Sequence, residues 1–391
     1  MIHRRFLDIA IALIILSTLT VPALADGPSA VAWLKTQQNA DGGFGSPTSS
    51  IGTTSDAILA AAASGENAFA WSKGGKTPLD FVSGELNRQS NIGSITKAGD
   101  LAKVILALTA NKMNPRTVFG TDLIKKLEAM IGSDGKIGGQ ADFINEHCMA
   151  MIALNSAFRP SNPQTISYLA SRQIQDGTWS WNGDTTEGSG DNNTTAIAVV
   201  ALAAAGVPVD NGQIQQAMAH LKKQQNADGG FPYINPSPYG TASDSNSTAV
   251  VMWAIIAVGQ DPSGTHWKYF NRDGTSVYDR IVSFQNASGA FRWQDTASDD
   301  NFLSTVQALI ALERKSLPFA RFDVDQPVKP TPTPEPVAET TVGTTEPTAA
   351  GEPEFLPISG VTPWLFAATL LASGVALAGI GLRLRNPSRS S

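Results

Sequence analysis

Two kinds of segment with helical spacing alternate through the middle of the chain. One kind is charged on one side only, as in Asp122–Glu128 and around His220-Leu221-Lys222-Lys223, which predicts helices at a surface. The other kind is apolar on nearly every face, which predicts helices buried on all sides. The segments of this second kind are Asp56–Ala63, Asp100–Leu108, Asn145–Leu154, Thr194–Ala205, Ser247–Val258 and Asn301–Leu312. Charged helices outside and uncharged helices inside predict a double-walled ring.

A short phrase lies between each charged segment and the apolar segment that follows it. It consists of a glutamine, three residues, a glycine, one residue, and then an aromatic residue or isoleucine. The copies are Gln38–Phe44, Gln89–Ile95, Ile131–Ile137 (which has lost the glutamine), Gln173–Trp179, Gln225–Phe231 and Gln285–Phe291. Successive glycines are 51, 42, 42, 52 and 60 residues apart, a period typical of stacked helical hairpins.

The phrase has the chemistry of a helix end. Glycine after aspartate readily takes positive φ and ends a helix, and the glutamine amide can satisfy free backbone groups there. The aromatic residue can then fold back against the end of the helix. Six copies predict a closed ring with a central cavity rather than an open solenoid.

The phrase is similar to the QW motif of squalene and oxidosqualene cyclases. Its Asp-Gly-Gly-Phe form, at Asp41–Phe44 and Asp228–Phe231, resembles the repeat of protein prenyltransferase β subunits. The resemblance covers Ala30 to about Leu317 and implies an all-α (α/α)6 toroid, a fold that cobalamin carriers and complement thioester domains share. Because one toroid hosts enzymes and carriers, the fold alone does not give the function.

The two ends of the chain have patterns of their own. Arg4 and Arg5 precede an apolar run, and Ala23-Leu24-Ala25 offers a cleavage site, which predicts a secretory signal peptide. Val361–Leu382 is apolar and, at roughly 33 Å as a helix, long enough to cross a bilayer. The arginines after it predict a cytoplasmic C-terminus. We therefore expect an exported protein that is held at the cell surface.

A motif before the apolar span resembles the LPxTG sorting signal of sortase substrates, with serine in place of threonine. It comprises Leu356, Pro357, Ser359 and Gly360. Either a plain membrane anchor or transfer by a sortase is compatible with this pattern. The expected divisions are a signal peptide (1–25), the toroid (26–323), a disordered Pro/Thr/Glu-rich stalk (324–355) and the motif, transmembrane helix and basic tail (356–391).

The net charge and the cysteine content limit which partners and which stabilising bonds are expected. The formal net charge is −6 and no basic patch is present, so nucleic acid is not an expected partner. Cys148 is the only cysteine, so an exported form has no internal disulfide and depends on packing for stability.

Terpene cyclases of class II protonate an alkene with the central Asp of a DxDD motif that is followed by Thr-Ala. The resemblance places this motif at Asp244-Ser245-Asn246-Ser247 and again at Asp191-Asn192-Asn193-Thr194. Both copies keep the first Asp, and asparagine occupies the position of the proton donor. An amide is no general acid, so both copies are interpreted as caps of inner helices. If the chain is an enzyme, Asp191 and Asp244 are the candidate catalytic residues.

Protein prenyltransferases hold Zn²⁺ with an Asp-x-Cys pair and a distant His. Glu146, His147 and Cys148 offer a weak version of such a ligand set. A zinc site needs three or four converging ligands, and a lone cysteine packed as a small apolar residue is the simpler interpretation.

Polar and aromatic residues that follow the turns are candidates for a ligand-binding rim. Acidic residues near the starts of the inner helices could form a polar rim or be ordinary helix caps. These are Asp56, Asp100, Glu146, Asp191, Asp244, Asp299 and Asp300. Aromatic side chains in loops beyond the turns favour an apolar or planar ligand. The expected ligand-binding set is Trp181, Tyr233, Tyr239, Trp293, Asp244, Asn246 and Asp300.

Together these patterns predict a surface-anchored toroid that binds rather than catalyses, with an apolar or corrinoid-like ligand in the central cavity. Cobalamin is one such ligand, and glycans and proteins are others. The first alternative is a divergent terpene cyclase or prenyltransferase-like enzyme. The second is an adhesion or protein-interaction module.

Overall fold

The computed structural model describes residues 25–92, 97–139, 143–238, 240–269 and 274–326. The expected signal peptide, sorting motif and membrane span lie outside these residues, apart from Ala25 of the signal peptide. Across the part of the chain that is described, no helix is long and apolar enough to span a bilayer. The described residues all belong to one compact unit, and the following paragraphs concern this unit alone.

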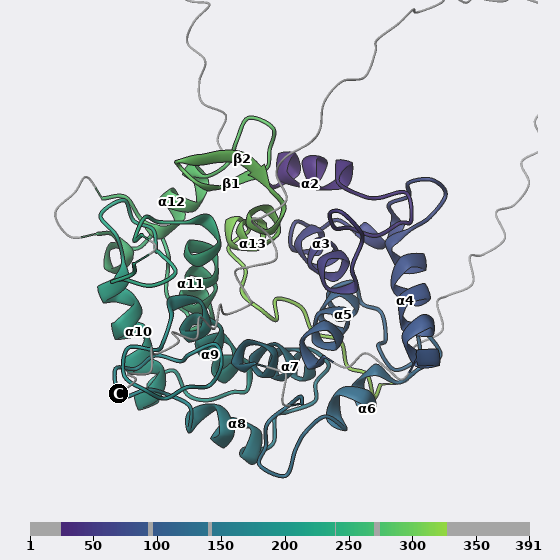
Figure 1. Ribbon diagram of the computed structural model, residues 1–391, viewed down its shortest axis with the longest axis horizontal. Coiled ribbons are helices and arrows are strands. Elements are labelled where there is room, and N and C mark those ends of the chain that lie inside the picture. Colours follow the sequence, from purple (N-terminus) through teal and green to yellow (C-terminus); the bar gives the residue numbers. More distant parts are fainter. Residues whose placement is uncertain (1–24, 93–96, 140–142, 239, 270–273, 327–391) are drawn as a thin grey trace, which may run out of the picture. The chain divides into compact units, whose positions relative to one another are not determined.

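The described residues form twelve α-helices arranged as two concentric walls (Figure 1). The inner wall is α3 (Ile51–Ala63), α5 (Ala98–Ala110), α7 (Ile144–Ser156), α9 (Asn192–Ala204), α11 (Ser245–Ala257) and α13 (Phe302–Leu312). The outer wall is α2 (Gly27–Thr36), α4 (Pro78–Ile92), α6 (Leu123–Glu128), α8 (Pro163–Ala170), α10 (Gly212–Gln224) and α12 (Val277–Ser283). Each inner helix packs against the next, and α13 packs against α3. The helix-dominated toroid expected from the sequence is confirmed.

The recurring phrase makes the same turn wherever the structure describes it fully. In the fifth copy, the Gln225 amide donates to the Gly229 carbonyl at 3.0 Å, and Gly229 has φ +88°. The N–H of Phe231 then donates to the hydroxyl of Thr248 on the following inner helix at 3.0 Å. A threonine accepts this bond in four repeats, and His147 accepts it through Nδ1 in a fifth. The phrase therefore connects an outer helix to its inner helix.

The turn glycines also set how closely neighbouring repeats approach. A Cβ on Gly135 would lie 2.3 Å from the Gln164 carbonyl oxygen at the start of the next outer helix. The seam between the last repeat and the first closes the ring. There Gln285 exchanges two hydrogen bonds with the backbone of Asp26, at 2.8 and 2.9 Å. The glycine in this phrase is thus required by its φ and by the neighbouring backbone.

The segment before α13 differs from the sequence expectation. It is not a plain loop but an antiparallel hairpin of β1 (Phe291–Gln294) and β2 (Ala297–Asn301), with Phe291 opposite Asn301. The end of the second copy of the phrase, from Gly93 to Ile95, falls outside the described residues.

After α13 the chain returns across the ring face at which the inner helices end, and we call residues 313–325 the strap. It runs from α13 toward α6 (Figure 1). Lys315 donates to the Ala63 carbonyl at the end of α3, and the Phe322 N–H donates to the Ser156 carbonyl at the end of α7, at 2.8 Å. The strap therefore covers this face of the ring.

The end of the strap is fixed by burial and charge. Val324 is buried, and the Asp325 carboxylate pairs with Arg116 at 3.2 Å and with Arg159 at 3.1 Å. The folded body therefore continues to Asp325, beyond the domain end that the sequence suggests at residue 323.

Candidate functional site

The other face of the ring, at which the inner helices begin, is called the mouth. Loops that follow two of the turns reach the start of the inner helix of the preceding repeat. The Ile144 N–H donates to the Trp181 carbonyl at 3.0 Å, and the Asn192 N–H donates to the Tyr233 carbonyl at 2.9 Å. The rim of the mouth is therefore built from the residues two positions beyond the repeat aromatics.

Helical spacing turns one stripe of each inner helix toward the centre of the ring. At the sixth helical position this stripe carries four partly exposed side chains, Asp56, Lys103, Met149 and Gln307, and two buried ones, Ile197 and Val250, each 6% exposed. One turn further on it carries Leu59, Leu106, Ile152, Val200, Trp253 and Ile310, none more than 5% exposed. The ring is packed at this second depth. The expected open central cavity is therefore replaced, among the described residues, by a shallow mouth with an apolar floor.

One half of the mouth is charged. Lys103 Nζ lies 2.7 Å from Asp56 Oδ2, and the two side chains are 31% and 21% exposed. Burial alone would lower the pKa of Lys103, but the carboxylates of Asp56, Asp100 and Glu146 raise it above its ordinary value. Burial in turn raises the pKa of Asp56 against the attraction of Lys103. This half therefore presents a fixed ammonium group surrounded by carboxylates.

The other half of the mouth is lined by amides. Asn246 Nδ2 donates to Gln307 Oε1 at 2.8 Å, and the Ser304 hydroxyl donates to Asn246 Oδ1 at 3.1 Å. Asn193 occupies the position on α9 that Asn246 occupies on α11. On the next inner helix, α11, the position equivalent to Gln307 of α13 is Val250, which offers Asn193 no amide partner. The buried Asn193 Oδ1 consequently receives no hydrogen bond from any described residue.

Large exposed side chains occur in the segments that follow the turns and at the start of α13. Tyr233 is 46% exposed, Trp293 on β1 is 45% exposed and Leu303 at the start of α13 is 49% exposed. Trp181 instead packs its ring against Phe143, 4.7 Å between centroids, which fixes the loop over α7.

Asp191 and Asp244 are helix N-caps in the structure. Each carboxylate accepts two hydrogen bonds, one from a backbone N–H at 2.7 Å and one from a hydroxyl at 2.8 Å. The donor residue is Thr194 for Asp191 and Ser247 for Asp244. Burial nevertheless raises the pKa of each carboxyl to about 6, and the hydrogen bonds, including one from the Tyr233 hydroxyl to Asp191, oppose this shift. The cap expected from the sequence is therefore what both residues form.

Replacing Asp244 by asparagine is expected to make stability less dependent on pH. The folded pKa of about 6 exceeds the ordinary 3.8, so the stability that Asp244 contributes is complete below about pH 4 and is lost as the pH rises through 6. Asparagine caps helices as well and does not titrate. Asp244→Asn should gain up to about 2–3 kcal/mol relative to the native chain between pH 4 and 6.5, measured by urea unfolding. A constant difference across this range would contradict the assignment.

Glu146, His147 and Cys148 do not converge on a metal site. The Glu146 carboxylate accepts from the Phe143 N–H at 2.5 Å, and His147 Nδ1 accepts from the Ile137 N–H at 3.0 Å. Cys148 is fully buried, and burial raises the pKa of its thiol. In the described ranges no three His, Cys, Asp or Glu side chains are grouped to hold a metal ion. The prenyltransferase-like ligand set is wrong, because three consecutive helical positions point in different directions.

His147 provides a second pH-dependent prediction. Burial lowers its pKa to about 4, so between pH 6.5 and 4 the unfolded chain takes up a proton that the folded chain refuses. Stability is therefore lost as the pH falls through this range. His147→Thr restores the hydroxyl acceptor used in other repeats, and it should remove about 2–3 kcal/mol of this loss in urea unfolding between pH 6.5 and 4. The same acid sensitivity in the variant would refute the role of His147.

Other residues of the expected rim lie elsewhere. Asp299 and Asp300 belong to strand β2 rather than to a helix start, and Asp300 accepts from Asn286 and Ser288 at 2.8 Å each. The helix cap is the next residue, Asn301, so the two aspartates are not caps of an inner helix. Tyr239 lies outside the described residues.

Sequence reasoning missed Lys103, Gln307 and Asn193 as mouth residues. The available signals were a polar residue inside an otherwise apolar segment, as for Lys103 and Gln307, and an asparagine in the first turn of the helix, as for Asn193. Such a residue can face the centre of a ring or a neighbouring helix, and the linear pattern does not distinguish the two cases.

Fold and mouth together define an α/α toroid of the kind found in terpenoid cyclases. Residues 141–295 match the family model "Squalene-hopene cyclase C-terminal domain", and residues 5–77 match "Prenyltransferase alpha-alpha toroid domain". A squalene–hopene cyclase of Zymomonas mobilis subsp. mobilis is 30% identical over 153 residues, 34% of this chain. The match spans 22% of that relative's length. Parts of the chain therefore resemble the prenyltransferase and squalene–hopene cyclase toroid domains, in agreement with the resemblance seen in the sequence.

Solved structures agree on the fold. The type II terpene cyclase MstE from Scytonema is 15% identical, with a TM-score of 0.51, and the match covers 74% of this chain and 96% of the cyclase. A glycosidase in complex with glucose is 13% identical, with a TM-score of 0.51, and covers 74% and 95%. At these identities the likeness shows the fold alone.

Proposed function

We propose that this chain is a cyclase-type toroid that binds a small planar ligand over its mouth. The observation that carries the proposal is the amide-lined half of the mouth, where Asn246 and Gln307 pair, together with the half-exposed rings of Tyr233 and Trp293 in the segments that follow the turns. An exposed aromatic face and nearby amides suit a ligand with a flat apolar surface and hydrogen-bonding edges.

The packed floor favours binding over cyclisation. A cyclase encloses its substrate so that water stays away from reactive intermediates. Here the floor residues, such as Val200 and Trp253, leave no room for a long apolar chain beneath the mouth. The proton donor's position holds Asn246, whose amide is already bonded to Gln307. A corrinoid such as cobalamin, with amide groups around a planar ring, belongs to the proposed ligand class.

The test uses the purified full chain. Its absorption spectrum and the masses of co-purified molecules identify a bound corrinoid directly, and titration with cyanocobalamin, followed by tryptophan fluorescence, gives the affinity. Trp293→Ala and Asn246→Ala are expected to weaken binding about tenfold or more. Phe158→Ala is the control, because Phe158 is 52% exposed just beyond the opposite end of α7. Equal losses in all three variants, or no binding of cyanocobalamin or any co-purified molecule, would refute a mouth ligand and leave protein capture as the function.

A second candidate function is cyclase-like acid catalysis, which the comparisons favour. The segment that matches the squalene–hopene cyclase family contains both Asp191 and Asp244. Burial raises the pKa of both carboxyls to about 6, so each is partly protonated near neutral pH and could donate a proton. Product analysis after incubation with squalene or a prenyl diphosphate tests this function. Turnover that disappears in Asp191→Asn and Asp244→Asn would replace the binding proposal, and no turnover by the native chain would eliminate the enzyme.

We also propose that the chain is exported and anchored at the cell surface, because the signal-like start, the sorting-like motif and the apolar span occur in the order such proteins need. Cell fractionation should place the chain in the membrane or the cell wall. A sortase contribution predicts that Leu356→Ala shifts the chain from the wall to the membrane, whereas a plain anchor predicts no shift. Recovery in the cytosol would refute both.

A further inference from the structure

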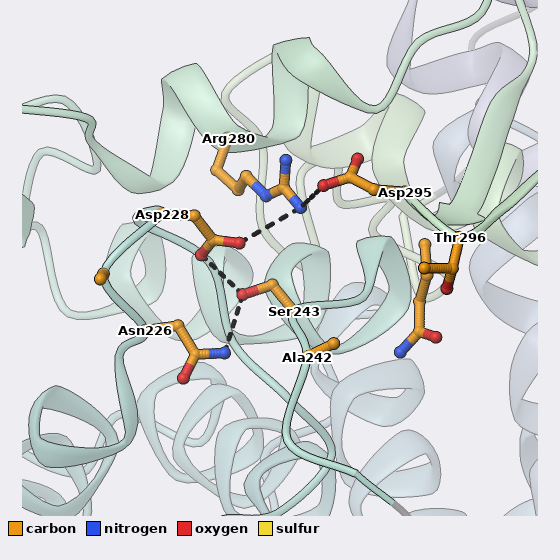
Figure 2. Close-up of a pocket in the computed structure, with 9 residues that line it drawn as sticks. Asn226, Asp228, Ala242, Ser243, Arg280, Asp295 and Thr296 are labelled. Atoms are coloured by element: carbon orange, nitrogen blue, oxygen red, sulfur yellow. Dashed lines mark hydrogen bonds and ion pairs between the residues drawn. The ribbon is translucent and has the colours of Figure 1, made fainter.

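A pocket of about 400 Å³ lies between the loops of the last two repeats (Figure 2). One wall is formed by Asn226–Asp228, after α10, and by Ala242 and Ser243, before α11. The other wall is the tip of the β1–β2 hairpin, residues 294–296, and Arg280 of α12 lies between the walls. None of these residues belongs to the inner-helix stripes of the mouth, so the pocket is a separate feature.

Hydrogen bonds hold the first wall in place. The Asn226 amide donates to the Ser243 hydroxyl at 3.0 Å, and this hydroxyl donates to Asp228 Oδ1 at 2.7 Å. Asp228 Oδ1 also accepts from the Gly230 N–H at 3.0 Å. The wall is therefore preformed, which lowers the entropic cost of binding.

A buried guanidinium joins the two walls. Arg280 is 8% exposed, and its plane lies over the Phe284 ring at 4.0 Å. Its Nη2 contacts Asp228 Oδ2 at 3.2 Å and Asp295 Oδ2 at 2.8 Å. Its Nε is buried and has no partner among the described residues. Figure 2 shows the chain of contacts from Asn226 through Asp228 and Arg280 to Asp295.

The charges of the pocket cancel. Asp228 and Asp295 carry two negative charges, and Arg280 and Arg292 carry two positive charges, with Arg292 Nη2 2.8 Å from Asp295 Oδ1. A charged ligand therefore gains little net electrostatic attraction from the pocket, and a neutral ligand is at little electrostatic disadvantage. The carboxylate side chains are still 42% and 57% exposed, so their remaining lone pairs can accept from a ligand.

Gln294 and Thr296 add uncommitted polar groups on the hairpin side. Their side chains make no hydrogen bond with another described residue and line the pocket directly. The amide and the hydroxyl both donate and accept. Neutral donor–acceptor groups opposite exposed carboxylates match a ligand with several adjacent hydroxyls, because a pair of hydroxyls can donate to one carboxylate and accept from an amide.

We propose that this pocket binds a neutral polyhydroxylated ring, such as one hexose unit of a glycan. The volume lies in the range of small-molecule sites, and the preformed, charge-balanced walls supply both donors and acceptors. The site does not depend on the mouth ligand, because the two sites share no residue.

The experiment measures binding of D-glucose to the full chain by saturation-transfer NMR, with ethanolamine and inorganic phosphate as charged probes. Glucose should bind, and Gln294→Ala and Thr296→Val should each weaken it by about three- to tenfold. Circular dichroism checks that these exposed substitutions leave the fold intact. Phe158→Ala, at the opposite face of the ring and outside both sites, is the control and should leave glucose binding unchanged.

Three outcomes would overturn the proposal. One is binding of ethanolamine or phosphate at least as strong as that of glucose, which would mean that charge determines recognition. Another is glucose binding that both pocket variants keep and Asn246→Ala loses, which would place the sugar in the mouth. The last is absence of a glucose signal from the folded native chain.

Discussion

Replacement of Gly289 by alanine is expected to lower the free energy of unfolding by about 3–5 kcal/mol. Gly289 has φ +90°, and a Cβ there would lie 2.3 Å from the Ser29 carbonyl oxygen at the start of α2. This seam joins the last repeat to the first, so the clash separates the hydrogen bonds between Gln285 and Asp26. Neither backbone can retreat without loosening the closed ring.

Urea unfolding of the native chain and of two variants measures this effect. Gly259→Ala is the matched control, because Gly259, at the end of α11, has φ +75° but a Cβ there would meet no atom within 4 Å. It should lose only about 1–2 kcal/mol from the left-handed backbone. Equal losses in the two variants would show that φ alone accounts for the effect and that the seam tolerates a methyl group.

Replacement of Trp179 by alanine is expected to cost a similar amount, about 3–5 kcal/mol, because it removes a fully buried indole. The indole Nε1 donates to the Leu169 carbonyl at 2.8 Å, so that acceptor also loses its partner. The residue belongs to the recurring phrase, and its backbone N–H donates to Thr195 at 3.1 Å. Trp179 therefore fixes an outer helix, a turn and an inner helix together.

Trp293→Ala is the corresponding control, because that indole is 45% exposed at the rim of the mouth. It should change the free energy of unfolding by no more than about 0.5 kcal/mol while weakening a mouth ligand. Thermal unfolding and ligand titration of the two variants distinguish structural from rim tryptophans. A large stability loss in Trp293→Ala would remove the rim tryptophan from the proposed binding surface.

The recurring turn could be predicted from the sequence because its causes are local. Gln225, Gly229 and Phe231 lie within seven residues of one another, and each acts on the same helix end. The positive φ of the glycine and the bond from the glutamine amide follow from residue chemistry at that spacing. The inner helices could be predicted for a similar reason, since a segment without a polar face has to be buried.

The candidate site could be predicted only in part. Asp191 and Asp244 were recognisable as helix caps, because an N-cap acts on residues two or three positions away. The partnership of Lys103 with Asp56 was not recognisable, because it joins two helices whose relative rotation is set by packing. Glu146, His147 and Cys148 failed as a ligand set for the opposite reason, since neighbours along a helix diverge in space.

By itself the sequence determined the repeats, the two classes of helix and the chemistry of the turns, since all of these arise from contacts within a few residues. Only the tertiary structure decided that Gln285 closes the ring on Asp26, that the strap covers one face, and that apolar side chains pack the centre beneath the mouth. It also decided that Arg280 joins Asp228 to Asp295 beside a pocket. Such contacts join residues far apart along the chain, and their distances depend on how all the helices pack at once.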